Sequence, residues 1–259
     1  MHCLGRRAKV ETYCERKWTR RHELGIPITC NLKPATQCQQ AYAKASRALG
    51  LIARTISYKS PEVLLKLYKT LVRPHVGYCV SAWSPYYVID KALLERIQHW
   101  FTRMVPGLKS LPYEERLDRL GIWTLEERRN RADLLQVFKL YKGWSSTPFG
   151  HFFTASTVTN TRGHTAKINK PRCHLVLRQS FFSYRVVDRW NDLPQSIIDS
   201  GTINTFKNGL NKLRKNRMGF FVDQPVRLAQ WPHQLWKIPN SRCGRTWYVT
   251  WYVECCEDI

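Results

Sequence analysis

The sequence predicts a mainly α fold, in which a helical bundle is followed by a small α+β C-terminal region and a poorly ordered tail. Apolar residues recur at helical spacing from about residue 35 to residue 141, and prolines or glycines separate the resulting stretches. After Gly143–Gly150, which is typical of a linker, the apolar runs become short and strand-like. Beyond about Asp223 they show no steady period.

These changes divide the chain into four parts. Residues 1–22 are polar and basic without a clear period, so we expect a flexible lead. Residues 23–142 hold a short strand and the helical bundle, and residues 143–222 form a C-terminal basic region. Residues 223–259 place tryptophans among Pro, Arg and Cys. We expect this last part to be disordered, or to be a tail appended by read-through.

The first elements follow from spacing and from capping residues. A short strand is expected near residues 23–28, and a helix over 35–54, where alanines favour it. Ser60 can cap a second helix, and Pro61 suits its first position. Pro74 is expected to end the regular part of that helix. The buried stripe of the first helix is predicted to contain Tyr42, Ala45, Leu49 and Ile52.

The next two helices are delimited in the same way. Asp90 is expected to cap a helix that runs to about Val105. A short amphipathic helix over 113–120 should close at Gly121. The core face of the longer helix is predicted to consist of Leu93, Leu94, Ile97, Phe101 and Met104.

A fifth helix begins with a capping box and leads into the C-terminal region. Thr124 and Glu127 have the required spacing of three, and the helix should run to about residue 141. Short strands are expected at 157–161 and 175–177. Helices are expected over about 181–190 and 203–215, the second with Lys207, Lys212, Arg214 and Lys215 facing outward.

The charge of the chain is its most unusual bulk property. Its 42 Lys and Arg residues outnumber 19 Asp and Glu residues, giving a net charge of +23 and a pI near 10.0. Such a surplus indicates a polyanionic partner, most often nucleic acid, although a basic solvated surface without a ligand is the alternative. No apolar run reaches about 18 residues and the N-terminus lacks a signal-like apolar core, so no membrane partner is expected. The nine cysteines are then expected to be thiols.

Basic residues recur on the predicted helix faces and could form one basic wall for phosphates. Contacts of this kind give affinity without base readout. A second basic segment lies in the C-terminal region, where a flexible basic loop is the equally weighted alternative. The candidate nucleic-acid-binding residues are Lys44, Arg47, Arg54, Lys66, Lys69, Arg73, Arg96 and Arg103 in the helices, and Lys167, Lys170 and Arg172 in the second segment.

Catalytic and metal-binding patterns are not found in the sequence. The chain has no Asp-Asp pair, and the paired carboxylates Glu114-Glu115 and Glu126-Glu127 lie in first helical turns, where the helix dipole explains them. The cysteines form no CxxC pair of the kind that structural zinc requires. Cys79 lies near His75, but no third group in the sequence orients such a pair. We therefore assign no catalytic residue and no metal ligand.

Several motifs resemble the region after the palm in LINE (non-LTR) retrotransposon reverse transcriptases of the jockey-like and chicken-repeat-like type. The resemblance covers roughly residues 23–222. A departure is His99-Trp100, where relatives tend to carry basic residues. The motifs are Leu24-Gly25, Asn31–Pro34, LYKTLVRPHVGY at 67–78, AWSP at 82–85, Tyr113–Leu117, Leu120-Gly121, Thr124–Arg129, Arg162–His164, Trp190–Pro194 and Thr205–Lys207.

The resemblance implies that the chain begins at the strand that leaves the palm and continues into a thumb-like bundle. The whole enzyme would be an RNA-directed DNA polymerase that uses magnesium. This chain lacks the aspartates that hold the metal, so we expect no polymerase activity and no cofactor. The expected partners are RNA, DNA or an RNA/DNA hybrid, bound without sequence preference, and an intact element polymerase. An inert translated remnant, or a protein-interaction module inside the cell, is the alternative.

Overall fold

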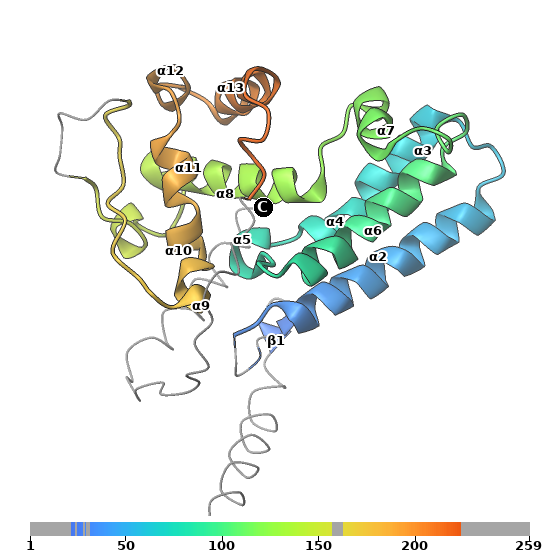
Figure 1. Cartoon of the computed structure of the whole chain (residues 1–259), viewed down its shortest axis with the longest axis horizontal. Coiled ribbons are helices and arrows are strands. Elements are labelled where there is room, and N and C mark those ends of the chain that lie inside the picture. The colour runs from blue at the N-terminus through green and yellow to red at the C-terminus, as the bar shows by residue number, and fades with distance from the viewer. Residues whose placement is uncertain (1–21, 24, 28, 30–31, 157–162, 224–259) are drawn as a thin grey trace, which may run out of the picture.

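The computed structural model describes residues 22–23, 25–27, 29, 32–156 and 163–223 (Figure 1). Most of the predicted lead, the predicted strand at 157–161 and the predicted tail after Asp223 lie outside the described residues. The part that is described is mainly helical, as predicted.

Long helices form one side of the molecule, and a single helix joins them to a group of shorter ones (Figure 1). α2 (Ala35–Thr55) and α6 (Val88–Met104) run in the same direction, and residues 61–77 lead back between their ends. α8 (Leu125–Tyr141) crosses the middle of the molecule, and α13 (Ile203–Asn216) lies along its other side. α8 therefore contacts both groups of helices.

A short hairpin precedes the first long helix. β1 (His22–Glu23) pairs antiparallel with β2 (Ile26–Pro27), and Gly25 turns between them at φ +76°. The single strand predicted near 23–28 is thus a two-stranded hairpin. α2 then matches its prediction closely, with Ala45 and Leu49 fully buried at helical spacing.

The second helix continues past Pro74, so the prediction that Pro74 ends it is wrong. The N–H of Arg73 bonds to the carbonyl of Tyr68, five residues earlier. In a regular α-helix a proline ring collides with the carbonyl four residues back. The wider π-helical turn directly before Pro74 accommodates the ring and keeps the helix. The segment consists of α3 (Pro61–Leu67), the π-helical turn η1 (Tyr68–Val72) and α4 (Arg73–Gly77).

Cys79 interrupts the helical conformation between α4 and the short helix α5 (Val80–Trp83). Its backbone is left-handed, with φ +49°, which is unusual for a residue other than glycine. Cys79 is disulfide-bonded, so the expectation that every cysteine is a thiol is wrong. Cys38 and Cys173 are free.

α6 begins three residues earlier than predicted. Tyr87 occupies the N-cap position without a side-chain cap, and Asp90 lies buried in the first turn. Asp90 is therefore not the cap, and burial raises the pKa of its carboxyl above the usual value. Leu94, Ile97 and Phe101 are fully buried, as the predicted core face required.

α7 (Tyr113–Leu120) and α8 follow the prediction closely. Gly121 ends α7 in the left-handed conformation at φ +60°. At the start of α8 both hydrogen bonds of the capping box are present, between Thr124 and the N–H of Glu127 and between the Glu127 carboxylate and the N–H of Thr124.

The C-terminal region is helical within the described residues, and its strand prediction at 175–177 is wrong. Val176 starts a one-turn helix instead, and the only sheet-like contact among described residues there is an isolated bridge between Ala155 and Ile168. The remaining elements are η2 (Phe149–His151), α9 (Val176–Gln179), α10 (Phe182–Arg185), α11 (Val187–Asn191), α12 (Gln195–Ile198) and α13.

One hydrophobic core extends through both groups of helices. Phe138 of α8 stacks on Phe206 of α13, with ring centroids 4.1 Å apart. Trp190 is fully buried beside them, and its indole N–H donates to the carbonyl of Ala166 at 2.7 Å. The division into parts at residue 142 stays a prediction, since α8 packs on helices from both predicted parts.

Candidate nucleic-acid interface

The cations predicted on the first helix lie along the outer face of α2. Lys44, Arg47 and Arg54 are all exposed. None has a side-chain hydrogen bond or ion pair within the described part of the chain. Their charges are thus available to a ligand.

α6 presents a second basic stripe. Arg96 and Arg103 are exposed, and Trp100 lies between them on the same face with 43% of its surface exposed. His99 is turned elsewhere, where its ring stacks on Tyr113 at 3.6 Å. Burial and the charges of Arg116 and Arg103 lower the pKa of His99, so its ring is neutral at pH 7.

The stripes of α2 and α6 meet at Trp100. Its indole lies 3.7 Å from the position that a side chain on Gly50 would occupy. Gly50 shares a helix face with Arg47 and Arg54, which are three residues before it and four after it. α2 and α6 run in the same direction (Figure 1). Because Gly50 lies against Trp100, the residue order then puts Arg47 on the side of Arg96, and Arg54 on the side of Arg103. We call these four arginines with Trp100 the α2–α6 face.

The third predicted group lies on α3, η1 and α4. Lys66 is exposed, Lys69 is partly exposed, and Arg73 is half-buried. This segment packs against α2, and it contacts α6 through Tyr68, whose ring stacks on Phe101 at 4.1 Å. Because α2, α6 and the segment 61–77 pack against one another, their solvent-exposed faces point in different directions. The prediction of one continuous wall from all three therefore stays a prediction.

Two of the three C-terminal candidates, Lys167 and Lys170, lie against other groups of the chain. Lys170 forms an ion pair with Asp188, and its ammonium lies 4.6 Å from the centre of the Tyr184 ring. Lys167 lies against Gly163, where an added side chain would come within 3.3 Å of Lys167 Cε. Arg172 is exposed.

Sequence reasoning missed Arg128, which lies close to Arg73. Arg128 is the fourth residue of α8, and α8 packs on α4 at this point. Burial first, and then the charge of Arg73, lower the pKa of Arg128 to about 10. The Arg128-Arg129 pair was visible in the sequence, but only the packing of α8 on α4 brings it beside Arg73.

The neighbouring arginines have structural partners. Arg129 is buried and lies 5.8 Å from the Trp83 ring. Arg131 and Arg214 each lie 4.9 Å from the ring of Trp123. Arg214 also pairs with Glu127, so the prediction that it faces outward is wrong.

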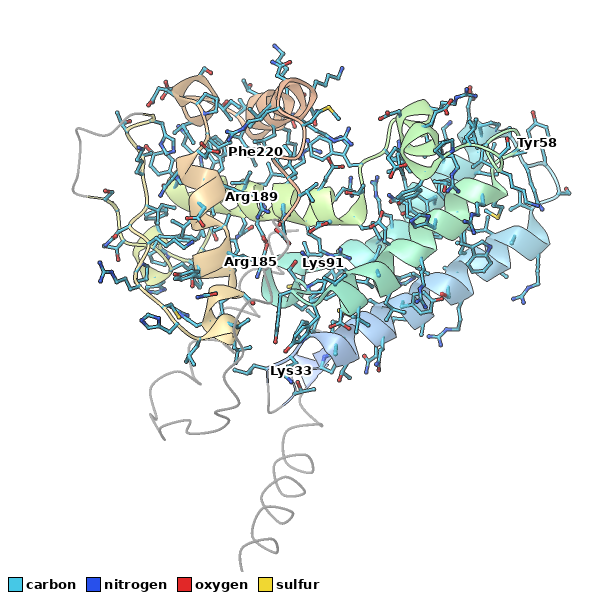
Figure 2. The ribbon with its side chains drawn as sticks, in the orientation of Figure 1. Lys33, Tyr58, Lys91, Arg185, Arg189 and Phe220 are labelled. Carbon is cyan, nitrogen blue, oxygen red and sulfur yellow. The ribbon has the colours of Figure 1, made fainter. Side chains whose placement is uncertain are left out.

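Two charged clusters hold the helical groups together near the middle of the molecule (Figure 2). Arg185 donates from Nε and Nη2 to the Asp133 carboxylate at 2.8 and 3.0 Å. Asp223 accepts from Lys91 and Arg189, and also from Asn130 at 3.1 Å. The three cations in these clusters, Lys91, Arg185 and Arg189, therefore already have carboxylate partners within the fold.

Among the described residues no cluster of three His, Cys, Asp or Glu side chains is placed to hold a metal ion. The described helices also include none with the length and apolar character that a membrane span requires. Comparison with known proteins gives no matching family model, no matching curated protein and no matching solved structure.

Proposed function

We propose that the chain is a fragment of a LINE-type reverse transcriptase that lacks the catalytic palm and binds template–primer nucleic acid through a basic helical face. The motifs in residues 23–222 support the family origin. The observation that carries the binding proposal is the α2–α6 face, where four arginines without ion pairs to described residues surround an exposed tryptophan.

This face suits a phosphate backbone rather than a particular base sequence. Guanidinium groups contact phosphate oxygens, and such contacts position a duplex without reading it. Trp100 adds an aromatic surface on which a base at a duplex end could stack. The proposed activity is therefore binding without sequence preference. Polymerisation is not proposed, because the sequence has no Asp-Asp pair to hold magnesium.

Binding of a labelled RNA/DNA hybrid, measured by fluorescence anisotropy at several salt concentrations, tests the proposal. We expect micromolar or tighter binding at low salt, with the logarithm of affinity falling by about 0.7–0.9 per tenfold rise in salt for each phosphate contacted. Absence of binding even at low salt would contradict the proposal. Polymerase activity of the purified chain would contradict the proposal that these 259 residues contain no catalytic palm.

The second candidate function is that of a protein-interaction module, and one observation favours it. Val88 and Ile89, at the start of α6, are 75% and 82% exposed, and Tyr87 beside them is also exposed. A partner that covered this apolar patch would bind with little dependence on salt. The same salt series therefore separates the two functions.

A further inference from the structure

Two arginines, Arg73 and Arg128, lie on helices that pack against each other, α4 and α8. Arg73 is the first residue of α4, and Arg128 is in the first turn of α8. The two helices are in contact. Arg129, the neighbour of Arg128, donates a hydrogen bond of 3.5 Å to the carbonyl of Val76 in α4. Both side chains remain partly exposed.

Neither arginine has a counter-ion among the described residues. No hydrogen bond or ion pair joins the Arg73 or Arg128 side chain to another described group. The charges that lower the pKa of Arg128 are those of Arg73, Arg131 and Arg129, and all three are positive. Burial also lowers the pKa of Arg73 below its ordinary value. A partly buried guanidinium beside others of the same charge is disfavoured unless an anion joins it.

We propose that Arg73 and Arg128 form a phosphate-binding site at the junction of α4 and α8. Two guanidinium groups offer planar, multiple N–H donors that match the oxygens of one phosphate. The phosphate belongs either to a nucleic-acid backbone or to a small phosphate anion. The site is separate from the α2–α6 face, and its first test uses no nucleic acid.

The first experiment measures thermal unfolding of the full chain in sodium phosphate and in sodium chloride of equal ionic strength. We expect phosphate to raise the melting temperature by about 2–4 °C, through preferential binding to the folded state. The rise should be absent in Arg128→Gln and in Arg73→Gln. Arg178→Gln removes an exposed arginine of α9 that lies over Phe181, and it should keep the whole rise.

Stability in chloride separates a ligand site from a structural role. Because Arg128 is repelled by its neighbours, Arg128→Gln should melt at the same temperature as the unaltered chain or above it. A lower melting temperature in chloride would show that Arg128 supports the fold, and would overturn the proposal.

The second experiment identifies the source of the phosphate. Binding of the RNA/DNA hybrid is compared between the unaltered chain, Arg128→Gln and Arg178→Gln. If the site takes a backbone phosphate, Arg128→Gln should weaken binding about tenfold, the effect of losing one charge-assisted hydrogen bond. The salt slope should also fall by about 0.7–0.9.

The outcomes keep this proposal distinct from the proposed function. If the chain does not bind the hybrid but phosphate stabilises it through both arginines, the site stands as one for a small phosphate anion and the proposed function fails. If the hybrid binds with the same affinity and slope in every variant, and phosphate stabilises all of them equally, the site is overturned and the proposed function stands.

Discussion

Glu127 of α8 and Arg214 of α13 form a two-bond ion pair, in which Nε and Nη2 of Arg214 each lie 2.9 Å from a carboxylate oxygen. The same carboxylate caps the start of α8. It therefore joins a local element of the sequence to a helix almost ninety residues away, and it fixes the position of α13 on α8.

Replacing Arg214 tests this connection. Arg214→Met leaves the mostly buried Glu127 carboxylate without its partner, and should lower the free energy of unfolding by about 1.5–3 kcal/mol. Urea denaturation at pH 7 measures the change. Arg217→Met is the matched control, since Arg217 pairs with Asp192 at the surface and should change stability by about 0–1 kcal/mol. Equal losses in both variants would contradict the prediction.

Gln98 of α6 joins three elements inside the core. Its amide accepts from the Tyr68 hydroxyl at 2.8 Å and donates to the Trp123 carbonyl at 2.9 Å. Gln98→Leu leaves the buried Tyr68 hydroxyl and the partly buried Trp123 carbonyl without these partners, so we expect it to cost about 1–3 kcal/mol per unsatisfied group. Thermal and urea unfolding measure it. Gln39→Leu, on the exposed side of α2, should be nearly neutral, and a loss as large as that of Gln98→Leu would argue against the network.

Asp223 should make stability depend on pH in acid. Burial alone would raise the pKa of its carboxyl, but Lys91 and Arg189 lower it well below the ordinary 3.8. A carboxyl whose pKa is lower in the folded state stabilises the fold above its unfolded pKa. This stability should be lost as the pH falls below about 4.

The measurement is urea denaturation at pH 7, 4 and 3. Asp223→Asn should be less stable than the unaltered chain at pH 7, and the difference should shrink as the pH falls. Asp118→Asn alters an exposed carboxyl and should show a small difference at every pH. A difference for Asp223→Asn that stays constant from pH 7 to pH 3 would show that its charge is not involved.

The α2–α6 face predicts a specific charge-reversal result. Arg47→Glu combined with Arg96→Glu should weaken hybrid binding at least about tenfold, because each reversal replaces attraction to phosphate by repulsion. Circular dichroism should show unchanged helicity, since both side chains are exposed. Lys212→Glu with Lys215→Glu on α13 makes the same change in net charge. If that pair weakens binding equally, overall charge and not this face accounts for the affinity.

Local rules predicted the elements whose boundaries depend on nearby residues. The helix over 35–54, the short helix closed by Gly121 and the capping box at Thr124 all appear in the structure as expected. Their caps and periods are satisfied within a few residues of the chain. The strand at 175–177 failed because its apolar residues have no neighbouring strand among the described residues, and a single helical turn forms at Val176 instead.

From the sequence, the candidate site could be predicted only as a set of basic residues, without their arrangement in space. Periodicity placed Arg47, Arg54, Arg96 and Arg103 correctly on outer faces. It could not show that Trp100 packs against Gly50 and so joins two of those faces. It likewise assigned Arg214 to the outside, because a single helix shows which face is polar but not which polar residue finds a partner.

The sequence by itself determined the helical class, most of the long helices and the strongly basic character, because these depend on composition and on spacing within a few turns. Only the tertiary structure decided that the helix continues through Pro74, and that Arg214 forms an ion pair with Glu127. It also decided that the charge of Arg73 acts on Arg128, which has no counter-ion in the described part of the chain. Each of these depends on which residues packing brings together, and interactions between distant parts of the chain leave no local period in the sequence.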